Sequence, residues 1–112
     1  MIAIQSCNVT VMVNSLDASI KFYTETLGFS LKNRYGEHWA DIEGPGISIG
    51  LHPNNKEIKV GDNLQIGLKV PDVMKAISEL EKKGVAFNIN NADKVKLAAF
   101  KDPDGNTLYL VQ

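Results

Sequence analysis

The side chains in this sequence that could bind or transform a small molecule are mostly aromatic or neutral. His52 ends an apolar segment, where an imidazole could act as a general acid or base near neutral pH. Because Pro53 follows it, His52 is more simply interpreted as an exposed residue at a strand end. Tyr109 offers a phenol as a second candidate proton carrier. Trp39 and Phe100 could stack against a flat or apolar ligand, or form the core of a dimer.

These residues belong to an internal repeat, which must position them. Segments 8–16 and 65–73 align at a constant offset, since 65 − 8 and 73 − 16 both give 57. Both segments begin with alternating apolar and polar residues. This pattern predicts a strand with one buried face at the start of each half of the chain.

A helix is predicted after each of these strands, with recognisable start and stop signals. Ser15 and Asp72 are good N-caps, and apolar residues at helical spacing follow both. Each helix ends at a glycine, Gly28 or Gly84, where a left-handed C-cap is expected. Near the end of the chain, residues 102–106 predict a tight turn. They lack the bidentate glutamate that closes a calcium loop.

The residues after each helix suit three short strands. The predicted strands are 29–34, 38–43 and 47–52 in the first half, and 85–90, 95–101 and 106–111 in the second. The sequence therefore predicts a single domain, 1–112, of two modules, each with the order strand, helix, strand, strand, strand. Module 1 covers about 1–52, a polar linker about 53–63, and module 2 about 64–112.

Alternation along the strands predicts which side chains face away from the helices. In the first strand Val9, Val11 and Val13 face the helix, so the residues between them face the other way. The same argument applies to the other strands. The face without helices is predicted to carry Asn8, Met12, Ser48, Gly50, His52, Gln65 and Tyr109, together with Trp39 and Phe100.

Two stretches of the sequence resemble a known superfamily. Residues 13–29 (VNSLDASIKFYTETLGF) and 100–106 (FKDPDGN) resemble the vicinal oxygen chelate superfamily, which includes glyoxalases, bleomycin resistance proteins and extradiol dioxygenases. The resemblance implies an α+β fold in which two βαβββ modules form a U-shaped mixed sheet with helices on the outside. It also implies a ligand in the cup of that sheet and a homodimer. Because one fold hosts many chemistries, the resemblance predicts the fold more sharply than the function.

The resemblance further implies where a metal would be bound. The ligand positions of metal-dependent members match Asn8, Gly50, Gln65 and Tyr109 in this sequence. A divalent cation needs several imidazole or carboxylate donors at once. Here two positions are neutral amides, one has no side chain, and the tyrosine would have to lose its phenolic proton. His52 shares a face with Gly50, but one imidazole and two amides do not make a metal site. We therefore expect no metal ion and no other cofactor.

Composition limits the classes of partner. The 112 residues carry 12 basic and 13 acidic side chains, a formal charge of -1 that lacks the basic footprint of proteins that bind nucleic acid or anionic membranes. Apolar runs are a few residues long, against about 20 needed to span a bilayer. The single cysteine, Cys7, is predicted to be a small buried hydrophobe. We expect a cytoplasmic protein that binds neither nucleic acid nor a membrane.

Together these observations favour a metal-free small-molecule-binding protein with its ligand in the cup. The predicted ligand contacts are Asn8, Met12, Trp39, Ser48, His52, Gln65, Phe100 and Tyr109. The alternative is a glyoxalase-like lyase, isomerase or dioxygenase-type enzyme acting on a small organic substrate, with His52 or Tyr109 as proton carrier. A third possibility is a cup filled by its own side chains, in a protein that acts as a dimeric interaction partner.

Overall fold

The computed structural model describes residues 3, 5–54, 64–87 and 97–112. The chain divides into two compact units, residues 1–58 and 59–112. Each unit holds one sheet and one α-helix. Beyond Asn54 the predicted linker lies outside the described residues.

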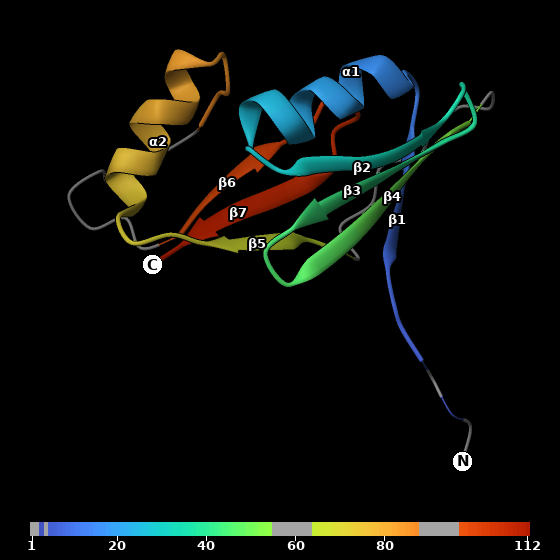
Figure 1. Ribbon diagram of the computed structural model, residues 1–112. Helices are drawn as coiled ribbons and strands as arrows, with labels where there is room; N and C mark the ends of the chain where they lie inside the picture. The colour runs from blue at the N-terminus through green and yellow to red at the C-terminus, as the bar shows by residue number, and fades with distance from the viewer. Residues whose placement is uncertain (1–2, 4, 55–63, 88–96) are drawn as a thin grey trace. The chain divides into compact units, whose positions relative to one another are not determined.

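The first module has a four-stranded sheet with a helix against one face (Figure 1). Its strands are β1 (Val9–Val13), β2 (Ser30–Tyr35), β3 (Trp39–Gly44) and β4 (Ile47–Pro53). The helix α1 (Leu16–Lys21) continues into a π-helical turn, η1 (Phe22–Thr26). The sheet order is β1-β4-β3-β2, with β1 parallel to β4 and the other neighbours antiparallel. The predicted order of strand, helix and three strands is confirmed here.

In the residues that the structure describes, the second module has a strand, a helix and two further strands. Its elements are β5 (Ile66–Lys69), α2 (Val73–Lys82), β6 (Leu97–Lys101) and β7 (Thr107–Val111). The sheet order is β5-β7-β6, with β5 parallel to β7 and β6 antiparallel to it. Of the strand predicted at 85–90, residues 85–87 have no regular structure and 88–90 lie outside the described residues. The predicted α+β class is confirmed.

The helix ends lie where the cap residues predicted them. The side chain of Ser15 accepts a hydrogen bond from the Ala18 amide at 3.2 Å, and Asp72 accepts one from the Lys75 amide at 3.1 Å. Gly28 and Gly84 have φ values of +82° and +93°. These are left-handed conformations that other residues adopt at a cost, so both predicted glycine caps are confirmed.

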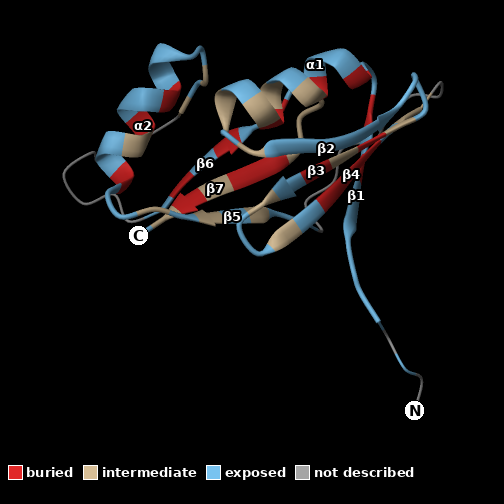
Figure 2. Ribbon diagram, viewed as in Figure 1, coloured by how far each residue is buried: buried red, intermediate tan, exposed pale blue. Residues whose placement is uncertain are grey.

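The core of each module lies between the helix and the sheet face that it covers (Figure 2). In the first module, alternate residues of β1 and β3 are buried, as in the pair Ala40 and Ile42, and Ile49 and Leu51 of β4 are buried on the same face. Tyr23, from η1, is fully buried beside them. In the second module Val73, Ile77 and Leu80 of α2 are buried, as are Leu108 and Leu110 of β7. The opposite face of each sheet, called the open face below, is not covered by the helix of its own module.

An ion pair joins α1 to the edge strand β2. Arg34 Nη1 lies 2.7 Å from Asp17 Oδ1, and Arg34 Nη2 lies 3.1 Å from Glu37 Oε1. The hydrogen bond that Arg34 donates to Asp17 is the main reason why the pKa of Arg34 is raised above its ordinary value. These groups lie away from the open face of the sheet, because Arg34 pairs with the buried Ala40.

The predicted tight turn between β6 and β7 is confirmed, and the Asp102 carboxylate organises it. Asp102 Oδ1 accepts hydrogen bonds from the amides of Asp104 and Asn106 at 2.9 and 2.8 Å. Asp102 Oδ2 accepts another from Asn106 Nδ2 at 2.8 Å. Asp102 is 5% exposed, so the role of its carboxylate is to satisfy the backbone of this turn.

Candidate ligand-binding site

The open face of the first sheet carries the candidate site residues of the first module. Residues that pair across neighbouring strands share a face, and Gly50 of β4 pairs with Thr10 of β1 and Asp41 of β3. Met12 pairs with His52 in the same way. The positions of Met12 and His52 on this face are therefore as predicted, and both are exposed.

Trp39 covers Gly50 on this face. A Cβ atom at residue 50 would lie 2.1 Å from Trp39 Cζ2, which leaves room for no side chain other than hydrogen. Trp39 Nε1 donates a hydrogen bond to Asp41 Oδ1 at 2.6 Å, and this bond fixes the indole over the glycine. Gly50 is buried although its strand face is open, and Trp39 remains half-buried. Part of the indole is therefore available to a ligand.

His52 packs against the edge of this arrangement. Its ring centroid lies 5.8 Å from that of Trp39, with an interplanar angle of 75°, which is a T-shaped contact. His52 is exposed, as a strand-end residue would be, and it also belongs to the predicted site. The structure thus brings His52, Trp39 and Gly50 together.

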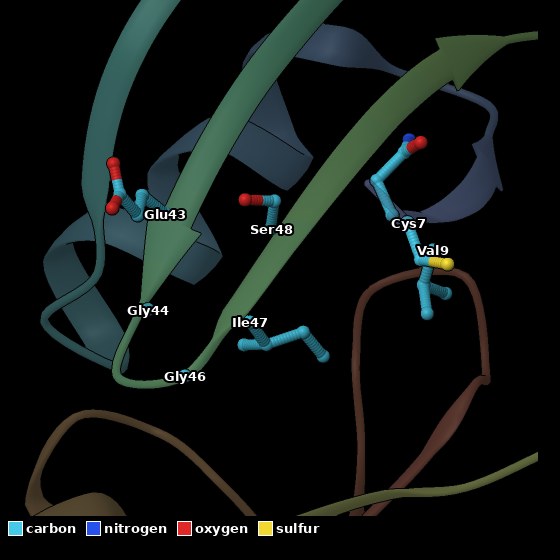
Figure 3. A pocket seen from close by; sticks show the side chains of 8 residues that line it. Cys7, Val9, Glu43, Gly44, Gly46, Ile47 and Ser48 are labelled. Atoms are coloured by element: carbon cyan, nitrogen blue, oxygen red, sulfur yellow. The ribbon is translucent and has the colours of Figure 1, made fainter. Parts of the chain in front are cut away.

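Two pockets lie at the end of this face where β1 begins and β3 turns into β4. The smaller, of about 200 Å³, includes Asp41, Lys32 and Gly50 in its wall. The larger, of about 440 Å³, extends towards the β3–β4 turn (Figure 3). Both pockets are lined by Asn8, Glu43 and Ser48. Asn8 and Ser48 were predicted as site residues. Lys32 and Glu43 were not predicted as site residues. Glu43 lies four residues after Trp39 on β3, so the alternation of that strand could have placed it on the same face.

The prediction that Cys7 is buried is wrong. The thiol is exposed and lines the larger pocket, together with Val9 (Figure 3). The expectation came from extending the alternation of β1 backwards along the chain. The strand begins at Val9, however, so at residue 7 no sheet pairing imposes that alternation.

The open face of the second sheet has a similar aromatic arrangement. Tyr109 of β7 pairs with Gly67 of β5, and its ring covers that glycine. A Cβ at residue 67 would lie 2.5 Å from both Tyr109 Cζ and its hydroxyl oxygen. Tyr109 is half-buried, and Gln65, just before β5, is exposed. In each module, then, an aromatic ring lies over a glycine of the adjacent strand.

The prediction that Phe100 faces the open side of its sheet is wrong. Phe100 pairs with Leu108, whose side chain is fully buried, and is itself 3% exposed. Its ring contacts that of Phe87, with the centroids 5.4 Å apart. Ala99 is the residue that pairs with Tyr109, so the register of β6 places Phe100 in the core.

The four positions where the resemblance places metal ligands do not fit a metal ion. Gly50 has no donor, and Trp39 fills the space that a donor side chain would need. Asn8 and Gln65 offer neutral amides, and Tyr109 turns its ring over Gly67. Among the described residues, no three His, Cys, Asp or Glu side chains come together in a way that could hold a metal. A divalent cation would have too few strong donors here.

Comparison with known proteins identifies the family. Residues 5–110 match the model of the Glyoxalase/Bleomycin resistance protein/Dioxygenase superfamily, and the chain belongs to this family. An uncharacterized protein of Mycolicibacterium smegmatis is 40% identical over 84 residues. The match covers 70% of this chain and 66% of that protein.

The fold of this chain is also similar to that of solved structures. A possible glyoxalase from Bacillus cereus superposes with a TM-score of 0.79 at 16% identity, covering 98% of this chain and all of that one. TnmS3, an antibiotic binding protein from Streptomyces sp. CB03234, is 27% identical with a TM-score of 0.67, covering 100% and 98%. No helix in the described residues has the length and apolarity that crossing a membrane requires.

Proposed function

We propose that this chain is a small-molecule-binding protein that holds an organic ligand in the predicted cup without a metal ion. The observation that carries the proposal is the Trp39 indole, which occupies the space over Gly50 where a metal ligand would have to stand. The Trp39 ring thus lies where the side chain of a metal ligand at residue 50 would need to be. The likeness to an antibiotic binding protein, TnmS3, supports a binding role.

The residues around Trp39 suit recognition of a ligand better than its transformation. The half-buried indole offers an apolar surface for stacking, worth about 0.5–1.5 kcal/mol beyond area burial. Asn8 and Ser48 offer neutral hydrogen-bonding groups in the wall of the adjacent pockets. A few polar groups beside an apolar surface are typical of a site that orients a small molecule.

The enzymatic alternative, with His52 or Tyr109 as proton carrier, has weaker support. A catalytic histidine is usually oriented by a hydrogen bond to a carboxylate. Here the carboxylate of Asp41, on the neighbouring strand, accepts a hydrogen bond from Trp39. The rings of His52 and Trp39 meet in an edge-to-face arrangement. We therefore propose binding, with no bond made or broken.

The proposal includes a homodimer in the cytoplasm. In their described sheets β1 and β5 are edge strands, each hydrogen-bonded to a single neighbour. Such edges have backbone groups left to pair with, and proteins commonly cover them. Sedimentation equilibrium of the purified protein should give twice the chain mass, and a monomer across the concentration range would contradict this part of the proposal.

Binding without a metal can be tested by saturation-transfer NMR with a panel of small aromatic compounds in the presence of EDTA. Trp39→Ala should abolish the transfer signals that the wild-type protein gives. Tyr35→Ala is the matched control, because Tyr35 pairs with Trp39 on the same face but is 57% exposed at the sheet edge. Signals that require added metal, or that survive Trp39→Ala, would contradict the proposal.

A further inference from the structure

The pocket beside Trp39 is lined by two carboxylates. Asp41 and Glu43 alternate along β3, so both face the open side, and both line the pocket of about 200 Å³. Glu43 has a counter-charge, because Lys32 Nζ, in the same wall, lies 3.5 Å from Glu43 Oε2. Glu43 and Lys32 are both more than half exposed, so this pair is weak.

Asp41 differs from Glu43 in the partners of its carboxylate. Asp41 Oδ1 accepts the hydrogen bond from Trp39 Nε1, and Asp41 Oδ2 lies 3.5 Å from Asn33 Nδ2. Both donors are neutral. Within the part of the chain that the structure describes, Asp41 takes part in no ion pair. Its negative charge is held beside the indole, and no ion pair among the described residues neutralises it.

This charge constrains which ligand can cover the site. A ligand stacked on Trp39 displaces water from the carboxylate bonded to it, and a carboxylate stripped of water is costly unless it gains a counter-charge. An ammonium or similar group on the ligand would supply one through a charge-assisted hydrogen bond. A cation is also attracted to the face of an indole.

We propose that the ligand of this site is an organic cation, with a flat apolar part against Trp39 and its positive group directed to Asp41. This inference rests on the proposed binding function and names the class of ligand. Neutral and anionic molecules of the same shape should bind less tightly, because they leave the Asp41 charge unmatched.

Three probes of similar shape separate the effect of ligand charge on affinity from the effect of ligand shape. They are 1-naphthylmethylammonium, 1-naphthylmethanol and 1-naphthoate. Isothermal titration calorimetry in EDTA should give a dissociation constant about tenfold lower for the ammonium than for the alcohol, as expected for a hydrogen bond to a charged group. The carboxylate should bind most weakly. Added sodium chloride should reduce the preference, since salt screens the attraction.

Asp41→Asn tests the residue, because it keeps an acceptor for Trp39 and removes the charge. This variant should bind the ammonium and the alcohol with similar affinity. Glu79→Gln, the same charge change on the exposed surface of α2, should keep the wild-type preference. If Asp41→Asn does not fold, Glu43→Gln in the same pocket should lower the preference severalfold, because it leaves Lys32 unpaired.

The possible results have distinct meanings. Equal affinities for all three probes in the wild-type protein would overturn the cation inference and leave metal-free binding intact. Loss of both ammonium and alcohol binding in Asp41→Asn would also overturn it, since Asp41 would then only hold Trp39 in place. If none of the probes binds, the proposed site around Trp39 is itself wrong, and the inference fails with it.

Discussion

Replacing Gly50 with alanine tests whether the Trp39 indole is held over that glycine. The new Cβ would lie 2.1 Å from Trp39 Cζ2 and 2.4 Å from Cη2, so the indole must move. Inserting one carbon into a packed site costs roughly 1–3 kcal/mol. Trp39 is half-buried and can swing towards solvent, which places the expected loss in the free energy of unfolding in the lower half of that range.

Two measurements follow this change. Urea denaturation monitored by circular dichroism gives the free energy of unfolding. Tryptophan emission gives the environment of the ring, and Trp39 is the only tryptophan in the chain. Gly50→Ala should shift the emission to longer wavelength as the indole becomes more exposed. Ser48→Ala, on the same strand but exposed, should leave the emission unchanged and alter stability by less than about 0.5 kcal/mol.

A double-mutant cycle identifies the cause of the loss. If the clash with Trp39 is responsible, Gly50→Ala should have almost no further effect on stability in a Trp39→Ala background. An equal loss in both backgrounds, with wild-type emission in the Gly50→Ala protein, would show that the indole does not depend on this glycine. Trp39 would then not be the reason why position 50 cannot hold a metal ligand.

Substitutions at three further positions test other contacts. Gly67→Ala should displace the Tyr109 ring and lower stability by about 1–3 kcal/mol in urea denaturation, and a wild-type value would contradict the packing of Tyr109. Gly28→Val should cost more than about 1 kcal/mol, because φ is +82° there, whereas Gly28→Asn should cost less; equal losses would refute a conformational cause. Asp102→Ala should lower the free energy of unfolding by about 2–3 kcal/mol, because three donors lose their acceptor; a change below about 0.5 kcal/mol would refute this role.

Features that depend on local sequence were predicted well. The N-caps Ser15 and Asp72 and the glycines at 28 and 84 act through residues close by in the chain, so their types alone indicate the helix ends. Alternation likewise assigned the buried faces of β1, β3 and β4, because a strand has a period of two wherever it is paired.

Features that depend on contacts between distant segments were not predicted. The position of Trp39 over Gly50 depends on the register of β3 and β4, which neither strand specifies alone. Phe100 was misplaced for the same reason, since pairing with Leu108 decides its face. Cys7 was misplaced because alternation does not extend beyond the end of a strand. The role of Asp41 required the observed hydrogen bond from Trp39.

Native mass spectrometry tests metal-independent binding most directly. The protein would be purified without added metal and measured before and after incubation with nickel, zinc and manganese. We expect the mass to stay that of the metal-free protein, and any small-molecule adduct to survive EDTA. Uptake of one metal ion per chain, or loss of the adduct on chelation, would contradict the donor set inferred from Asn8, Gly50, Gln65 and Tyr109.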